Sequence, residues 1–328
     1  MLNNSSILIT GGTGSFGHAF MSMTLKKYNP KRIVIFSRDE MKQWEMAKLH
    51  QNDTRVRFFI GDVRDKDRLY RALDGIDYVV HAAATKIVPT AEYNPFECVK
   101  TNINGAMNLI DACIDNGVKR VVALSTDKAS SPVNLYGATK LASDKLFTAS
   151  NSSYASGHDT KFSVVRYGNV IGSRGSVIPL FKKQRETGKI TITNADMTRF
   201  LITLKQGVDF VLKSLETMVG GELLVPKIPA CSVGDLADVL APEADKVLVG
   251  LRPGEKMHEV LIPSDEARNV LEFDDHFVIQ PVQAFWGNKI GILGGVQCTE
   301  GFYYASNVNC ETLSRDELST LLAEYIVH

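Results

Sequence analysis

The sequence predicts an α/β protein whose centre is a doubly wound parallel sheet, followed by a smaller C-terminal α/β region. Short β-branched runs alternate with segments of helical length through the first half of the chain, which is the rhythm of βαβ units. These runs also lack period-two alternation, as expected for strands covered by helices on both faces. The predicted strands are residues 7–10, 32–36, 56–60, 78–81, 120–124 and 162–166.

The length and composition fit a globular protein of about two domains. The chain has 328 residues, of which 44% are hydrophobic and 23% charged. Its 37 basic and 37 acidic residues balance, so no overall field favours nucleic acid or an anionic membrane. We expect no membrane span, because no apolar run reaches about 18 residues. The five cysteines form no C-x-x-C pair and the histidines no metal motif, which predicts reduced thiols, a cytoplasmic location and no metal.

The rhythm of strands and helices breaks after about Gly168. We therefore expect a nucleotide-binding domain over residues 1–168, with parts of 197–230 packing back on it, and a substrate-binding region over 169–328. The polar stretch 150–160 and the glycine-rich stretch 286–297 are predicted to be surface loops. Ser314 and Glu317 have the spacing of a capping box that opens a last helix, which we expect to reach about Tyr325.

The first predicted strand leads directly into a glycine-rich turn and then a helix. Glycines at this spacing allow a tight turn, a close approach of pyrophosphate to backbone N–H groups, and close packing of helix on strand. In this context the turn predicts a Rossmann-like dinucleotide site. The residues expected to bind the cofactor here are Gly11, Thr13, Gly14, Ser15, Phe16 and Gly17.

The residues after the second strand favour NADP over NAD, and those after the third could meet the adenine. Ser37 and Arg38 follow the second strand, where hydroxyl and guanidinium donors can bind a 2′-phosphate. Asp39 is either an acidic partner for the ribose or the N-cap of the next helix. Asp62 and Val63 end the third strand, where the Asp62 carboxylate can meet the adenine amino group or remain a solvated loop residue.

Tyr136 and Lys140 are four residues apart, so on a helix they share one face. An ammonium beside a phenol favours the phenolate and lowers the pKa of the tyrosine. Tyr136 could then take a proton from a substrate hydroxyl during hydride transfer. The pair follows the fifth predicted strand, so it should lie near the nucleotide site.

Together these features resemble the extended short-chain dehydrogenase/reductases and, among them, the configuration-inverting UDP-N-acetylglucosamine 4,6-dehydratases. The motifs that carry the resemblance span nearly the whole chain: Gly11-x-x-Gly14-x-x-Gly17, His81-Ala82-Ala83-Ala84, Asn102, Ser125-Thr126-Asp127-Lys128-Ala129, Tyr136-Gly137-Ala138-Thr139-Lys140, Arg166-Tyr167-Gly168-Asn169-Val170 and Arg252-Pro253-Gly254-Glu255-Lys256.

The resemblance implies the first step of bacterial pseudaminic acid synthesis, which serves flagellin glycosylation, and a homo-oligomer, either a dimer or a hexamer. It implies UDP-N-acetylglucosamine as substrate, and cofactor contacts from Ala82, Ala83, Ala84, Asn102, Tyr136 and Lys140. On the substrate side it implies that Asn169 meets the sugar or diphosphate, that Arg199 and Arg252 hold the diphosphate and that Glu255 meets the uridine ribose, with Lys86 nearby. Arginine suits phosphate because its planar fork binds bidentately; a surface ion pair is the alternative for both arginines.

Thr126, Asp127 and Lys128 supply more groups than hydride transfer alone needs. An acid and an amine at the carboxyl end of a strand lie where substrates bind in open α/β sheets. After C4 is oxidised, Lys128 would remove the C5 proton while Asp127 protonates the leaving C6 hydroxyl, and Thr126 would bond the C4 oxygen. These roles require the pKa of Lys128 to fall and that of Asp127 to rise, as burial would cause.

Three alternatives to the inverting dehydratase function stay open. A 4,6-dehydratase/epimerase of the N-acetylfucosamine route typically has Met in place of Tyr136, and a UDP-sugar 4-epimerase would not need Asp127 and Lys128. A nucleotide-sensing regulator would not need the complete Thr, Tyr and Lys set. The chain also departs from wider relatives at Thr85 and Ile87, where those have Leu and His, and at Leu201, where we expect Trp.

Overall fold

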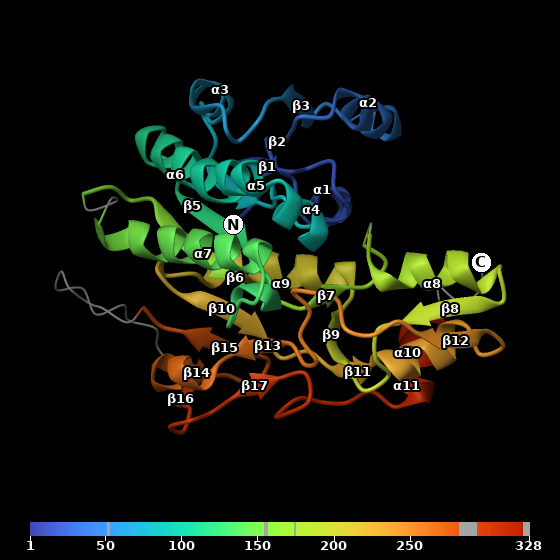
Figure 1. The fold of residues 1–328 in the computed structure, drawn as a ribbon. Helices are drawn as coiled ribbons and strands as arrows, with labels where there is room; N and C mark the ends of the chain where they lie inside the picture. Colours follow the sequence, from blue (N-terminus) through green and yellow to red (C-terminus); the bar gives the residue numbers. More distant parts are fainter. Residues whose placement is uncertain (51–52, 154–156, 174, 282–293, 324–328) are drawn as a thin grey trace.

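The structure, a computed structural model, describes residues 1–50, 53–153, 157–173, 175–281 and 294–323. A large, mostly parallel sheet runs through the molecule, and the C-terminal third gathers at one side of it (Figure 1). Across the ten-stranded sheet the order is β16 (Val296–Gln297), β14 (Val270–Glu272), β15 (His276–Ile279), β10 (Leu223–Pro226), β6 (Lys161–Val165), β5 (Arg120–Leu124), β4 (Tyr78–His81), β1 (Ser6–Thr10), β2 (Arg32–Ser37) and β3 (Val56–Ile60).

The seven strands from β3 to β10 are parallel, which confirms the predicted fold class. Six of them are the strands expected from the sequence, and β6 begins and ends one residue earlier than expected. The central strand β1 is buried at every residue, because helices cover both of its faces. The strand order reverses between β1 and β4, the position where open α/β sheets bind their ligands.

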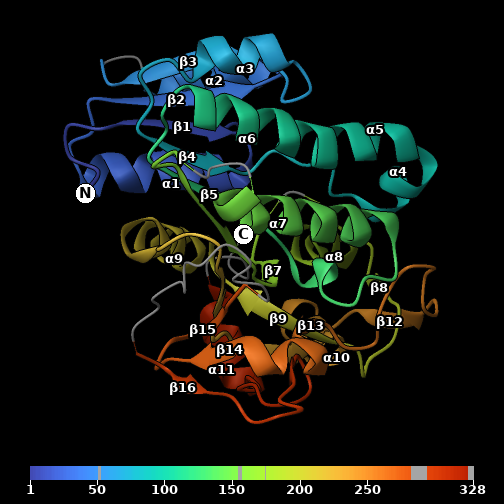
Figure 2. The ribbon, with the colours of Figure 1, turned by 90° about the vertical axis from the view of Figure 1, so that its left-hand side faces the viewer.

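Two helical layers enclose the parallel strands. On one face α1 packs against α9; on the other α6 packs against α3 and α7, and Figure 2 shows α6 and α7 side by side. A π-helical turn (Lys100–Asn104) precedes α6, and a 3-10 turn (Asp127–Ala129) follows β5. The helices of this part are α1 (Ser15–Lys27), α2 (Glu40–Leu49), α3 (Lys66–Ala72), α4 (Val88–Tyr93), α5 (Pro95–Val99), α6 (Gly105–Asp115), α7 (Leu135–Ser153) and α9 (Leu204–Thr217).

Helix α7 extends into the stretch that the sequence predicts as a loop. Ser150 Oγ donates to the carbonyl of Leu146 at 2.7 Å, and Asn151 Nδ2 donates to the carbonyl of Phe162 at 2.8 Å. These polar side chains bond backbone carbonyls of their own helix and of β6, so they continue the helix through Ser153 instead of ending it.

The rest of the chain forms a second, smaller core. Three helices and two of the three small sheets build this core, whereas Leu261, Ile262 and Tyr304 of the third small sheet belong to the first core. A 3-10 turn lies at Ser264–Asn269. The capping box expected at Ser314 is confirmed, with reciprocal bonds to Glu317. The elements of this part are β7 (Asn169–Val170), α8 (Val177–Arg185), β8 (Lys189–Ile192), β9 (Thr198–Ile202), β11 (Ala230–Ser232), α10 (Val233–Leu240), β12 (Asp245–Leu248), β13 (Val260–Ile262), β17 (Tyr304–Ala305) and α11 (Arg315–Leu321).

The boundary between the two parts is interwoven. Helix α9 and strand β10 return to the large sheet, and β14, β15 and β16 also extend it antiparallel. The sequence did not predict these three strands. Residues 286–293 of the glycine-rich stretch lie outside the described residues, as do the end of the last predicted helix and Tyr325. The last two residues of that stretch form strand β16 and not the predicted loop. In the described part of the chain, no helix is both long and apolar enough to cross a bilayer.

Candidate functional site

The carboxyl end of β1 forms a tight glycine cradle. Gly11 has a φ of +66°, and Gly14 is the N-cap of α1 without a side chain to bond the first N–H groups of that helix. A Cβ on Gly17 would lie 2.1 Å from the carbonyl oxygen of Gly12, so only glycine lets α1 begin this close to the strand. The cradle therefore fits a diphosphate, which backbone N–H groups at a helix N-terminus bind readily.

A hollow of about 210 Å³ lies beside this cradle. It includes eight of the residues predicted to bind cofactor, while Gly14, Ser15, Phe16, Gly17, Ala82, Asn102, Tyr136 and Lys140 are not part of its lining. The sequence reading missed Lys42, which also lines it. The full lining is Gly11, Thr13, Phe36, Ser37, Arg38, Asp39, Lys42, Gly61, Asp62, Val63, Ala83, Ala84 and Thr101.

The charged rim of this hollow carries both signs. Asp39 caps α2 by accepting from the Lys42 backbone at 3.0 Å, and its carboxylate pairs with Lys42 Nζ at 2.6 Å. Arg38 Nη1 lies 3.7 Å from Asp62, whose carboxylate also accepts two bonds from the Arg64 guanidinium. Asp39 is the N-cap of α2, and it also lines the hollow. A contact between Asp39 and a ribose stays a prediction.

Asn102 is buried, and its amide is bonded within the protein. Its Oδ1 accepts from the Thr85 backbone at 2.8 Å, and its Nδ2 donates to the Thr85 carbonyl and to Thr139 Oγ1. The residue thus ties the loop after β4 to α7. Its predicted contact with a cofactor stays a prediction.

The 3-10 turn after β5 brings the predicted acid and base together. Asp127 is buried, and Lys128 Nζ lies 3.1 Å from its Oδ1. Thr126 Oγ1 donates to the same oxygen at 2.9 Å. The other carboxylate oxygen, Oδ2, is buried without a hydrogen-bond partner. A buried carboxylate oxygen without a partner is costly, so this oxygen is free to bond a further group.

Tyr136 and Lys140 lie on one face of α7, and both are buried. Burial raises the pKa of Tyr136 to about 12, and the nearby Lys128 ammonium and Thr126 hydroxyl oppose that rise. Lys140 Nζ instead donates to the Leu124 carbonyl at 2.7 Å. The prediction that Lys140 lowers the pKa of this phenol is therefore wrong for this state of the protein: burial dominates, and the opposing ammonium is that of Lys128.

The expected fall in the pKa of Lys128 is also wrong here. Burial lowers that pKa, but Asp127 and Glu259 outweigh burial, so the pKa of Lys128 is raised. Glu259 Oε1 lies 3.0 Å from Lys128 Nζ. No motif in the sequence assigns Glu259 a role. Because residues 128 and 259 are far apart in the chain, no local spacing could have predicted the contact.

The residues predicted to bind substrate lie around this cluster in different settings. Asn169 begins β7, and its Oδ1 is buried without a partner. Arg199 donates to the carbonyls of Thr198, Lys256 and Met257. Arg252 and Glu255 lie in the turn before β13. The Glu255 carboxylate accepts a hydrogen bond from the backbone N–H of Arg252, and the Arg252 side chain is exposed.

That turn is tied to α7, because Asn134 Nδ2 donates to the carbonyl of Gly254 at 2.9 Å. Lys86 is exposed in the loop after β4, and Leu201 is buried in the second core. The substrate contacts of all these residues stay predictions.

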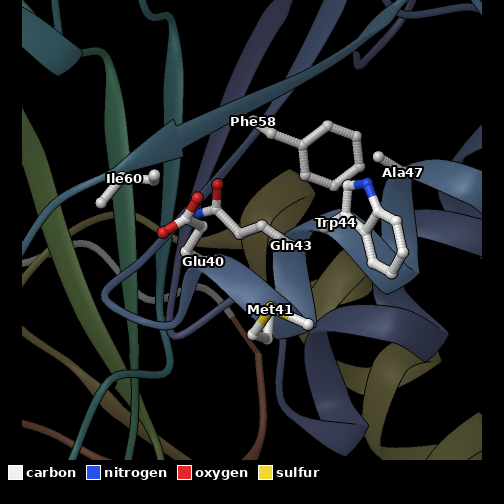
Figure 3. A pocket seen from close by; sticks show the side chains of 7 residues that line it. All are labelled: Glu40, Met41, Gln43, Trp44, Ala47, Phe58 and Ile60. Carbon is white, nitrogen blue, oxygen red and sulfur yellow. The ribbon is translucent and has the colours of Figure 1, made fainter.

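A larger hollow, of about 370 Å³, lies at the outer edge strand β3 and helix α2. None of the predicted site residues lines it. In Figure 3 the Trp44 and Phe58 rings lie close to Ala47, and the lining is Glu40, Met41, Gln43, Trp44, Ala47, Phe58 and Ile60. In the described ranges, no group of three or more His, Cys, Asp or Glu side chains could hold a metal ion, and all five cysteines are free.

Comparison with known proteins places this site in a family. Residues 7–281 match the family described as polysaccharide biosynthesis protein. The chain belongs to this family. Among its relatives, the UDP-N-acetylglucosamine 4,6-dehydratase (inverting) of Campylobacter jejuni serotype O:2 is 52% identical over 98% of each chain. A UDP-glucose 4-epimerase of Rickettsia conorii is 43% identical over 85% of this chain and 84% of its own.

Solved structures of similar proteins confirm the Rossmann-like fold. The X-ray structure of Pen from Bacillus thuringiensis has a TM-score of 0.90 at 38% identity, covering 99% of this chain and 98% of Pen. DesIV of Streptomyces venezuelae, a dTDP-glucose 4,6-dehydratase with NAD and TYD bound, has a TM-score of 0.69 at 25% identity, covering 77% of this chain and 86% of its own. The resemblance deduced from the sequence motifs is thereby confirmed.

Proposed function

We propose that this protein removes water from UDP-N-acetylglucosamine and inverts C5, giving UDP-2-acetamido-2,6-dideoxy-β-L-arabino-hex-4-ulose. The observation that carries the proposal is the Asp127–Lys128 pair, 3.1 Å apart, beside the buried Tyr136 at the carboxyl end of β5. An epimerase needs no such second acid and base. The 52% identity to an inverting dehydratase over nearly the full length supports the same substrate and outcome.

One set of residues serves the oxidation at C4, and a second set serves the elimination of water from C5 and C6. Thr126 holds the C4 oxygen and Tyr136 takes the C4 hydroxyl proton, with Lys140 placed one helical turn away. The resulting C4 ketone acidifies the C5 proton, which Lys128 removes while Asp127 protonates the C6 hydroxyl, so that the C6–O bond breaks and water leaves. Tyr136 then returns a proton to C5 from the opposite face, which inverts that centre.

The Asp127–Lys128 pair can do this without exchanging protons with solvent. Moving one proton from the Lys128 ammonium to Asp127, across 3.1 Å, turns the ion pair into a neutral amine and a carboxylic acid. Those are the forms that the elimination needs. When Lys128 has taken the C5 proton and Asp127 has given its own, the ion pair is restored.

A nicotinamide cofactor fits the glycine cradle and the hollow beside Ser37. When bound, it supplies the hydride acceptor for C4 and returns that hydride to C6. We propose NADP specifically, because Ser37, Arg38 and the additional Lys42 line one rim of the hollow with donors suited to a 2′-phosphate. The NAD bound to DesIV supports the coarser assignment of a nicotinamide cofactor.

Cofactor choice can be tested at Arg38. Arg38→Ala should weaken the binding of NADP far more than that of NAD, because only NADP presents the 2′-phosphate. Binding titrations of both cofactors to the variant measure the difference, and Arg57→Ala, in the neighbouring strand β3 and outside the hollow, is the control. Equal weakening of both cofactors by Arg38→Ala contradicts the NADP assignment.

Several further assignments are part of the proposal. We place the cofactor-binding domain at residues 1–168 and the substrate-binding region at 169–328, with Asn169, Arg199, Arg252, Glu255 and Lys86 around the nucleotide sugar. The unpartnered Asn169 Oδ1 supports this. We also propose a homo-oligomer in the cytoplasm, consistent with the free thiols, that carries out the first step of pseudaminic acid synthesis.

The reaction itself is tested by incubating the protein with UDP-N-acetylglucosamine in deuterated water. We expect the sugar nucleotide to lose one water, and NMR of the early product to show deuterium at C5 in the L-arabino configuration. Each alternative predicts a different product. A C4 epimer without water loss indicates an epimerase, an early D-xylo product indicates a retaining dehydratase, and an unchanged substrate indicates a non-enzymatic role.

A further inference from the structure

We propose that Glu259 is a positioning residue of the dehydration site, which holds the Lys128 amine against Asp127 and keeps their shared proton bound. This inference rests on the proposed function. It adds a residue from the C-terminal part to a catalytic group that otherwise comes from β5 and α7.

Glu259 is held rigidly just before β13. Its backbone N–H donates to Ser306 Oγ at 2.9 Å, and its carbonyl accepts from the Ser306 backbone at 2.8 Å. Its side chain is only 3% exposed, and Oε1 lies 3.0 Å from Lys128 Nζ. A fixed, buried carboxylate at this distance restricts where the flexible lysine side chain can place its amine.

The charges around Lys128 show what Glu259 contributes. The negative groups facing the amine are Asp127 and Glu259; the positive ones are Arg199, whose Nε lies 3.9 Å from Glu259 Oε1, and Lys256, whose Nζ lies 4.0 Å from Oε2. The neutral phenol of Tyr136 completes the surroundings. Without Glu259, the carboxylate of Asp127 would be the single negative group among the three cations Lys128, Arg199 and Lys256.

One oxygen of Glu259 is not used for holding the fold. Oε2 is buried and has no hydrogen-bond partner. A glutamate that served only to fasten β13 would be expected to satisfy both oxygens, since burying an unpaired carboxylate oxygen is costly. Oε2 lies 4.0 Å from Lys256 Nζ, while Oε1, 3.0 Å from Lys128 Nζ, places negative charge beside Lys128, which agrees with the raised pKa of that lysine.

This charge sets the pH range of the reaction. The elimination needs one proton shared by Asp127 and Lys128, and above some pH that proton is lost to solvent and the rate falls. Glu259 stabilises the protonated pair, so the loss occurs at higher pH than it otherwise would. An opposite charge this close typically shifts a pKa by about one to three units.

Glu259→Gln is the direct test, because it keeps the shape of the side chain and removes the charge. We expect the alkaline limb of the kcat–pH profile to move down by about one pH unit or more. The matched control is Glu272→Gln, which removes a carboxylate paired with Lys227 at 2.7 Å outside the site; its profile should match the wild type. A Glu259→Gln profile that superimposes on the wild type overturns the inference.

Glu259→Asp is the second variant, and it carries the test if Glu259→Gln does not fold. It keeps the charge but moves it farther from Lys128, so the alkaline limb of its kcat–pH profile should lie at a pH between those of the wild type and Glu259→Gln. If Glu259→Gln does not fold, the limb of Glu259→Asp should still lie at a lower pH than that of the wild type. An unmoved limb overturns the inference. Failure of the proposed function is distinguishable, because the wild type itself would then not remove water from UDP-N-acetylglucosamine.

Discussion

Replacing Lys128 with alanine is expected to slow water loss by about 10²–10⁴-fold, the usual contribution of a general base, while C4 oxidation continues. The reason is the division of groups around the site. In the proposed mechanism Tyr136, Thr126 and Lys140 serve the C4 hydroxyl, whereas Lys128, 3.1 Å from Asp127, takes the C5 proton. A single turnover of the variant should therefore accumulate reduced nicotinamide, seen by absorbance, without a dehydrated product in the mass spectrum.

Two companion variants make that result specific. Tyr136→Phe removes the group that takes the C4 proton, so neither reduced nicotinamide nor dehydrated product should form. Lys66→Ala removes an exposed lysine paired with Asp111, and both steps should proceed normally. If Lys128→Ala dehydrates at the wild-type rate, another group is the C5 base.

The parallel half of the fold was predictable because its signals are local. Strands β1, β2, β4 and β5 have continuous apolar centres that end beside turn residues, and helices cover them on both faces. Strands β14 and β16 have only three and two residues, too short for a pattern to stand out. Strand β14 pairs with β15 and β16 pairs with β14, and these contacts form only once the chain has folded.

The candidate site was predictable to the extent that its residues follow strands. Gly11, Asp62 and Lys128 all come shortly after the ends of parallel strands, which meet at one edge of the sheet. Glu259 comes from a later segment, brought to Lys128 by the bonds between its backbone and Ser306. The direction of the Lys128 pKa could not be foreseen for the same reason: burial was predicted, but the second carboxylate was not.

Gly137→Ala is expected to disrupt the reaction by moving Lys128. Gly137 lies in the first turn of α7, directly after Tyr136, and a Cβ at this position would lie 2.1 Å from the backbone carbonyl oxygen of Lys128. A backbone carbonyl cannot swing away as a side-chain tip can, so the 3-10 turn and α7 must separate. Alanine is otherwise the better helix former by about 1 kcal/mol, which shows that the close approach, and not helix propensity, requires glycine here.

The expected cost appears in both stability and rate. Forcing a methyl group into a packed contact costs about 1–3 kcal/mol, and displacing a reacting group by about 1 Å can cost about 10²-fold in rate. Gly207→Ala is the matched control, since this helical glycine of α9 has its nearest neighbour, Ile202 Cδ1, at 3.9 Å; it should leave the rate unchanged and stability unchanged or higher. Chemical denaturation and the water-loss assay measure the two effects. If Gly137→Ala matches Gly207→Ala in both, the packing of α7 against the Lys128 turn does not position the base.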